Sequence, residues 1–208
     1  MRHKPMLLSK LAARSNMAAR FSIGLLGTHH GSGVTYTGLM LAFYLGEEMG
    51  KRTAFIECNR HQDMRLIEEA YEWTSSEKNS FSFRNITCYK ELAMEQIPLI
   101  YAEEYEALIF DFGIDLSFSI NEFLRCDKRV VLAGRTEWEL ARLKSLHERL
   151  KHASGKGSLI YLIRQADNKT IQRLSGELGC TVMSIPFAAD PVALTRNIIR
   201  FFEALLCC

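Results

Sequence analysis

The sequence contains no apolar run close to the roughly 18 residues of a membrane-spanning helix, so a transmembrane helix is excluded. Its six cysteines form no CxxC pair and follow no metal-ligand spacing, which favours free thiols in a reducing, cytoplasmic setting. A net charge of +2 gives no strong attraction to nucleic acid. With no internal repeat and no low-complexity linker, the 208 residues, 48% of them hydrophobic, indicate a globular domain.

The first 20 residues contain no acidic residue, although they carry Arg2, Lys4, Lys10, Arg14 and Arg20. They also lack the apolar segment of a secretory signal, so export is not expected. A basic helix on anionic lipid or nucleic acid and a transit peptide are alternatives, but we favour a solvated extension. We therefore divide the chain into a basic extension, residues 1–20, and a single domain, residues 21–208.

Apolar, β-branched-rich runs alternate with helical patterns along this domain. Strands are expected at 21–26, 52–58, 105–110, 129–133, 158–163 and 181–185, with a short strand at 83–89. Helices are expected at 35–49, 64–73, 91–104 with an interruption at Pro98, 119–125, 137–152, 170–178 and 193–206. The segment 74–82 is polar and has the least regular pattern. The alternation predicts a three-layer α/β fold: a doubly wound, mostly parallel sheet with helices on both faces.

Ligands of such folds bind outside the carboxyl ends of the strands. Four of the expected strands end at Leu26, Cys58, Phe110 and Ala133, and the loops after them are predicted to meet at one edge of the sheet. Any chemistry of this protein is therefore expected in these four loops.

The first of these loops, residues 27–35, has the glycines of a phosphate-binding loop but lacks its lysine. Such a loop cradles phosphate with backbone N–H groups, reaches the β- and γ-phosphates with a lysine, and holds Mg²⁺ with a hydroxyl. Here the glycines and Thr35 are present, whereas Val34 stands in the place of the lysine. A glycine-bearing turn without a ligand is the alternative. The predicted nucleotide-binding residues are Gly31, Ser32, Gly33, Val34, Thr35 and Tyr36.

Five segments stand in the order found in one known family. The loop His29-His30-Gly31-Ser32-Gly33-Val34-Thr35-Tyr36 aligns without a gap with the family pattern K-G-G-x-G-K-T-T. The others are a strand at 53–61, an apolar strand that ends on Asp111, a strand and loop at 132–137, and the late pair Ile185-Pro186. On these motifs, residues 21–208 resemble the ParA/MinD family of deviant P-loop ATPases.

The resemblance implies a P-loop NTPase-like fold of the SIMIBI type and a site for ATP or ADP with Mg²⁺. It places Thr35 and Asp111 on the metal, and it implies a face-to-face homodimer with nucleotide at the interface. From the residues alone, Asp111 is equally well explained as a cap of the turn after a buried strand. Glu57 is either a second carboxylate near Mg²⁺ or, as we slightly favour, a strand-end residue paired with Arg52 or Arg60.

Four positions depart from the family pattern. Val34 replaces the loop lysine, His29 the additional signature lysine, Asn59 the water-orienting aspartate, and Ile163 the adenine-recognising asparagine. Loss of one charge-stabilising donor lowers a rate by roughly 10²–10³. The resemblance therefore implies a degenerate member with little or no ATP hydrolysis and no catalytic residue that we can assign.

Three functions follow as hypotheses. The first is a binding-only protein with a localisation, scaffold or regulatory role, which acts through a protein partner that the sequence does not identify. The second is a slow ParA/MinD-type ATPase that dimerises on ATP and uses a replacement lysine, with Lys51 or Lys10 as candidates. The third and weakest is a small-molecule enzyme such as a dethiobiotin-synthetase-like ligase.

The segment 193–206 has an apolar face and invites two interpretations. It is either an amphipathic helix that contacts a membrane or, as we favour, a helix that packs on the sheet. The final pair, Cys207-Cys208, resembles a dual-lipidation ending, but no upstream polybasic cluster supports that interpretation.

Overall fold

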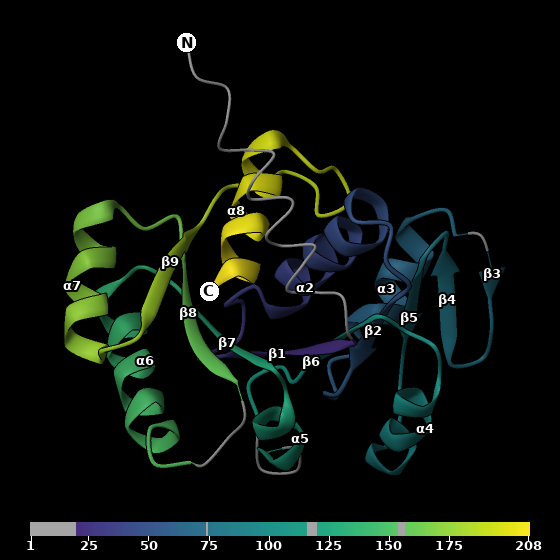
Figure 1. The fold of residues 1–208 in the computed structure, drawn as a ribbon, viewed down its shortest axis with the longest axis horizontal. Coiled ribbons are helices and arrows are strands. Elements are labelled where there is room, and N and C mark those ends of the chain that lie inside the picture. The colour runs from purple at the N-terminus through teal and green to yellow at the C-terminus, as the bar shows by residue number, and fades with distance from the viewer. Residues whose placement is uncertain (1–19, 74, 116–119, 154–156) are drawn as a thin grey trace.

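The computed structural model describes residues 20–73, 75–115, 120–153 and 157–208, so the basic extension lies outside the described residues except for Arg20. A nine-stranded sheet runs through the molecule in the order β3-β4-β5-β2-β6-β1-β7-β8-β9 (Figure 1). Neighbouring strands are parallel from β5 to β9 along this order, and β3, β4 and β5 pair antiparallel. The expected α/β fold with a mostly parallel sheet is confirmed.

The elements have the following bounds. The strands are β1 (Phe21–Gly27), β2 (Thr53–Glu57), β3 (Ser75–Ser76), β4 (Ser80–Phe83), β5 (Ile86–Tyr89), β6 (Ala107–Asp111), β7 (Lys128–Ala133), β8 (Ser158–Arg164) and β9 (Thr181–Ile185). The helices are α2 (Val34–Phe43) with its π-helical continuation η1 (Tyr44–Glu48), α3 (Asp63–Ala70), the 3₁₀ turn η2 (Met94–Gln96), α4 (Ile97–Ala102), α5 (Ile120–Arg125), α6 (Glu137–Leu150), α7 (Asn168–Leu178) and α8 (Arg196–Cys207).

Alternate residues of the central strands enter two apolar cores, one on each face of the sheet. In β7, Val130 and Leu132 belong to the core under α2 and α8, whereas Val131 and Ala133 belong to the core under α4, α5, α6 and α7. Figure 1 shows these two groups of helices on opposite sides of the sheet. Because strand side chains alternate between faces, near-continuous apolar strands are the sequence pattern of a sheet that is covered on both sides.

Helix α2 lies unusually close to the sheet. A Cβ at Gly38 would come within 2.7 Å of the Phe55 ring of β2, so only glycine permits this approach. Nearly all of α2 is buried, from Thr37 to Phe43 without interruption. The helix therefore fixes the loop that precedes it rigidly against the central strands.

Two expected elements differ in the structure. The expected strand at 83–89 is a hairpin, β4–β5, in which Arg84 adopts a left-handed φ of 51° at the turn. The expected helix at 91–104 begins only at Ile97, with Pro98 in its first turn, where the missing N–H of proline has no helical acceptor to lose. The polar segment 74–82, expected to be irregular, contributes β3 and the start of β4 to the edge of the sheet.

The C-terminal helix α8 packs on the sheet. Ile198, Phe202 and Leu205 are buried in the core that α8 shares with α2, and Thr195 caps the helix by accepting the N–H of Ile198. The core-packing interpretation of this segment is confirmed. In the described part of the chain, no helix combines the length and apolarity needed to cross a bilayer.

Candidate functional site

The loop between β1 and α2 forms an open cradle of backbone amides. Gly31 and Gly33 adopt left-handed φ values of 78° and 92°, and Gly33 occupies the N-cap position of α2. The first N–H groups of a helix have no acceptor within the helix and carry the positive end of its dipole. The loop therefore presents unsatisfied donors to an anion, and it lines a cavity of about 410 Å³.

Val34, at the position of the missing lysine, is part of the apolar core. Its side chain is only 6% exposed. A Cβ on Gly27 would lie 2.8 Å from Val34 Cγ2 and 2.2 Å from the hydroxyl of Ser32. Glycine at 27 thus lets the loop fold back onto the end of β1. The buried Ser32 hydroxyl has no hydrogen-bond partner among the described residues.

Oxygen atoms from three elements converge beside this cradle. The Thr35 hydroxyl, in the first turn of α2, donates to Asp111 Oδ2 at the end of β6 over 2.7 Å. The same hydroxyl lies 3.2 Å from Asp63 Oδ2, at the first position of α3. Hydroxyl and carboxylate oxygens are the ligands that Mg²⁺ prefers. No group of three His, Cys, Asp or Glu in the described ranges is arranged to hold a metal by itself, so a cation here needs further oxygens from water or a phosphate.

Asp111 caps the turn that follows β6, one of the two roles that its sequence position suggested. One oxygen faces Thr35, while Oδ1 accepts the N–H of Gly113 over 2.9 Å and the Asn59 amide over 3.0 Å. Burial raises the pKa of this fully buried carboxyl, and the bonds from Thr35 and Gly113 oppose the shift. Asn59 therefore orients the aspartate.

Glu57 lies beside Asp111 in the register of β2 and β6 and is only 1% exposed. Its Oε1 accepts the N–H of Met64, 3.4 Å away, in the first turn of α3. Burial, with a smaller contribution from the Asp111 charge, raises the pKa of Glu57 to about 7. The side chain thus joins the start of α3 to the end of β2, and the ion pair with Arg52 or Arg60 expected from the sequence is not among its described contacts.

His29, at the position of the signature lysine, has both ring nitrogens in contact with other side chains of the same chain. Its Nε2 lies 3.0 Å from Glu139 Oε1, and its Nδ1 lies 2.9 Å from the Thr28 hydroxyl. Glu139 also accepts the N–H and hydroxyl of Thr136 in the capping box of α6. These bonds from Thr136, more than the His29 charge, lower the pKa of Glu139. The four loops expected at this edge, after β1, β2, β6 and β7, therefore do meet there.

A basic side chain reaches the cradle from another strand. Arg164, the last residue of β8, donates from Nη1 to the carbonyl of Gly31 over 2.7 Å. It lines a second cavity, of about 450 Å³, together with Tyr36, Met40, Pro186 and the exposed ring of Phe187. Ile163, which precedes Arg164, is fully buried in the core and faces neither cavity.

Lys51, a candidate replacement for the loop lysine, does not lie at this site. It precedes β2 and therefore stands at the amino-terminal edge of the sheet, opposite the cradle. Its Nζ lies 3.1 Å from Glu106, which precedes β6 at that same edge. The other candidate, Lys10, lies outside the described residues.

Sequence reasoning missed three residues of this site: Asp63, Glu139 and Arg164. The signal for Asp63 was its place at the start of a helix, directly after the loop that follows β2. Glu139 was part of a visible capping box with Thr136. Arg164 had no signal in the sequence, because its contact with Gly31 bridges 133 residues.

No protein-family model matches the sequence, and no curated protein matches it either. Among solved structures, a cobyrinic acid a,c-diamide synthase from Mycobacterium smegmatis, with bound ADP and magnesium, matches with a TM-score of 0.66 at 11% identity, over 90% of this chain and 94% of that chain. A putative plasmid partition protein from Borrelia burgdorferi B31, bound to AMPPNP, has a TM-score of 0.64 at 12% identity over 90% and 97%. The septum site-determining protein MinD from Pyrococcus horikoshii, complexed with Mg-ADP, has a TM-score of 0.61 at 15% identity over 86% and 85%. The chain therefore has the fold of the ParA/MinD P-loop ATPases.

Proposed function

We propose that this protein binds ATP or ADP with Mg²⁺ and hydrolyses ATP little or not at all. The observation that carries the proposal is the contrast between two neighbouring residues. Val34 is buried in the core where a phosphate-binding lysine would stand, whereas Thr35 keeps its hydroxyl on Asp111. The loop thus keeps the amides proposed to hold phosphate and the oxygens proposed to hold Mg²⁺, but it lacks the positive charge of the lysine.

The residues present fit a magnesium nucleotide. The loop amides other than that of Ser32, which donates to the His29 carbonyl, would hold the phosphates. Thr35 and Asp111 would hold Mg²⁺, with Asp63 close enough to share a water ligand. The 450 Å³ cavity beside Arg164 and Pro186 suits the nucleoside. The similar structures with bound AMPPNP, Mg-ADP, and ADP and magnesium support this assignment.

Weak hydrolysis is the consequence of three side chains. Phosphoryl transfer depends on positioning and on neutralising the charge that develops on the phosphates. Val34 contributes no charge, His29 is engaged with Glu139, and Asn59 holds Asp111 rather than a water molecule. If each missing donor lowers the rate by roughly 10²–10³, turnover falls close to background.

A protein that binds nucleotide without hydrolysing it can act only through the conformation that it adopts with nucleotide bound. We therefore assign it a localisation, scaffold or regulatory role in the cytoplasm, exerted on a protein partner, with a homodimer as the nucleotide-bound form. The contact between Thr35 and Asp63 joins the phosphate loop to the start of α3.

A slow ATPase is the second candidate, and one observation favours it. Arg164 places a guanidinium within hydrogen-bond distance of the loop, at the carbonyl of Gly31. A guanidinium is always charged and binds phosphate in two-pronged geometry. If the guanidinium turned from the Gly31 carbonyl to a γ-phosphate, it would supply part of the positive charge that the missing lysine would provide.

One pair of measurements separates the two candidates. Purified protein is titrated with a fluorescent ATP analogue in the presence of Mg²⁺, and phosphate release is then followed at saturation. Binding in the micromolar range without release supports the nucleotide-binding role. Release that is abolished in Asp111→Ala supports the slow ATPase, and absence of binding at millimolar nucleotide contradicts both.

A further inference from the structure

A third cavity, of about 400 Å³, shares no lining residue with the two cavities at the phosphate loop. Four aromatic side chains line it: Phe43 at the end of α2, Tyr71 and Trp73 after α3, and Phe83 in β4. The ring centroids of Phe43 and Phe83 lie 5.7 Å apart, and those of Trp73 and Phe83 lie 6.5 Å apart. The cavity is therefore an aromatic cage whose rings come from three segments of the chain, and Val192 and Leu194 from a fourth segment complete its lining.

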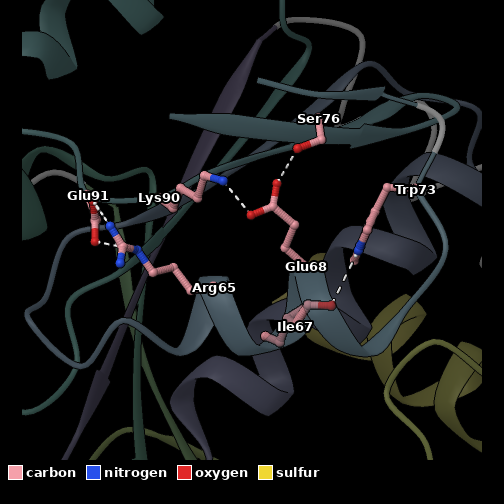
Figure 2. Close-up of polar contacts among 7 residues, drawn as sticks. All are labelled: Arg65, Ile67, Glu68, Trp73, Ser76, Lys90 and Glu91. Carbon is pink, nitrogen blue, oxygen red and sulfur yellow. Dashed lines mark hydrogen bonds and ion pairs between the residues drawn. The ribbon is translucent and has the colours of Figure 1, made fainter. Parts of the chain in front are cut away.

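The two aromatic residues with polar atoms are held in place by those atoms. Trp73 donates its indole N–H to the carbonyl of Ile67 over 3.3 Å, and Tyr71 donates its hydroxyl to Asp190 Oδ1 over 3.2 Å. Figure 2 shows the bond from Trp73 to Ile67 on α3. Because the indole N–H and the tyrosine hydroxyl are both hydrogen-bonded, these two aromatic side chains need little reordering when a ligand enters the cavity.

Helix α3, which carries Ile67, is itself fastened to the edge of the sheet. Glu68 pairs with the nearly buried Lys90 and accepts the hydroxyl of Ser76 over 2.6 Å (Figure 2). One turn earlier, Arg65 pairs with Glu91 over 2.6 Å. These contacts keep the side of the cage formed by Trp73 at a fixed place relative to β4 and β5.

The polar part of the lining is predominantly acidic. Among the described residues, it consists of Glu47, Glu48, Glu72 and one basic residue, Arg84. The Arg84 guanidinium lies 5.0 Å from the ring of Phe83 and pairs with the Glu47 carboxylate. The chain thus already places one cation against an aromatic ring and a carboxylate of this cavity, which is the geometry of a cation–π site.

We propose that this cavity binds a positively charged side chain, of arginine or lysine, presented by a basic peptide segment of a partner protein. Aromatic faces attract a cation that has left water, and the glutamates supply the opposite charge. The same glutamates repel an anion. A cavity of 400 Å³ has room for one long side chain.

Arg84 competes with such a ligand. It occupies Glu47 and adds a positive charge to the rim, so its removal frees a carboxylate. Arg84 is exposed and has a φ of 51°, a conformation that asparagine adopts far more readily than other residues. Arg84→Asn therefore removes the built-in cation without disturbing the β4–β5 turn.

The test uses the full chain with Trp138→Phe, which leaves Trp73 as the sole tryptophan of the sequence. Trp138 is 69% exposed, so its replacement is mild. N-acetyl-arginine amide and N-acetyl-lysine amide are expected to change the fluorescence of Trp73 saturably, whereas the uncharged N-acetyl-citrulline amide is not. Glu47→Gln with Glu72→Gln is expected to weaken binding at least about fivefold, and Arg84→Asn to strengthen it about threefold or more.

Equal responses to arginine and citrulline amides would overturn the proposal, as would unchanged or weaker binding in Arg84→Asn. The source of the cation is tested by replacing Arg2, Lys4, Lys10 and Arg14 with glutamine. Unchanged binding of the arginine amide supports an external partner. Tighter binding would overturn the proposal of an external partner, because the chain's own basic extension would then have been competing with the arginine amide for the cavity.

Discussion

Thr35 and Asp111, separated by 76 residues in the sequence, share a hydrogen bond of 2.7 Å at the carboxyl edge of the sheet. The bond joins the first turn of α2 to the end of β6, and Asp63 lies 3.2 Å from the same hydroxyl. The bond gives the buried Asp111 carboxylate a partner. In the proposed nucleotide complex, these oxygens would be the ones that hold Mg²⁺.

The first prediction concerns this pair. Thr35→Ala and Asp111→Asn should each weaken nucleotide binding in the presence of Mg²⁺ by at least about tenfold, because each removes an oxygen from the proposed cation site. Binding in EDTA should change much less. Fluorescence titration with and without Mg²⁺ measures both values, and Thr181→Ala, an exposed threonine at the opposite edge, is the matched control. Equal losses with and without Mg²⁺ would place these residues outside the cation site.

The second prediction concerns Arg164, whose guanidinium lies 2.7 Å from the Gly31 carbonyl. Arg164→Ala should weaken binding of ATP about tenfold, since an exposed charged donor to phosphate is partly screened by water. Arg164→Lys should recover part of the loss. Arg125→Ala, on the exposed end of α5, serves as control. If Arg164→Ala binds ATP as tightly as the unaltered protein, Arg164 does not contact the phosphates.

The third prediction follows from the raised pKa of Glu57. Because its pKa of about 7 lies above the ordinary value of 4.5, the folded protein holds a proton that the unfolded chain has lost between these values. Stability from this group is therefore greatest at the acid side of this window and falls as the pH rises from about 4.5 to about 7, by up to about 3 kcal/mol.

Glu57→Gln should remove this part of the pH dependence while still accepting the N–H of Met64. Urea unfolding at about pH 5.5 and about pH 8 measures the free energy of unfolding of both proteins. Relative to the unaltered protein, the variant should be more stable at the higher pH than at the lower one. Asp111, whose pKa burial also raises, contributes in the same direction, so the variant should keep part of the pH dependence. Parallel pH profiles for the two proteins would contradict the assignment.

The fourth prediction tests the close approach of α2 to the sheet. Gly38→Ala should destabilise the protein by about 1–3 kcal/mol, because its Cβ would overlap the Phe55 ring. Gly176→Ala is the matched change in α7, where a Cβ meets no atom within 4 Å. It should stabilise the protein by about 0.5–1 kcal/mol by raising helix propensity. Equal effects in thermal unfolding would argue against the tight packing of α2.

The sequence predicted the sheet and the four-loop edge because apolar periodicity and strand order are local signals. The same local signals brought the start of α2 and the end of β6 to one edge, where Thr35 contacts Asp111. The hairpin β4–β5 was not predicted because its turn contains no glycine, and Arg84 adopts the left-handed backbone conformation there instead.

The remaining contacts of the site are long-range. Arg164 and His29 find their partners across strands that are distant in sequence, and no spacing rule encodes such pairs. Val34 is a different case. The sequence shows that the lysine is absent, but only the packing shows that valine fills the core at this position.

The central claim is that the phosphate cradle persists although its lysine has been replaced. The most direct test compares ATP binding in the unaltered protein, in Val34→Lys, and in Val34→Met as a control for the lost packing of valine. We predict binding by the unaltered protein without phosphate release, and an affinity that rises at least about tenfold in Val34→Lys but not in Val34→Met. No binding by the unaltered protein and no gain in Val34→Lys would contradict the account, because the loop would then have lost the shape that phosphate requires.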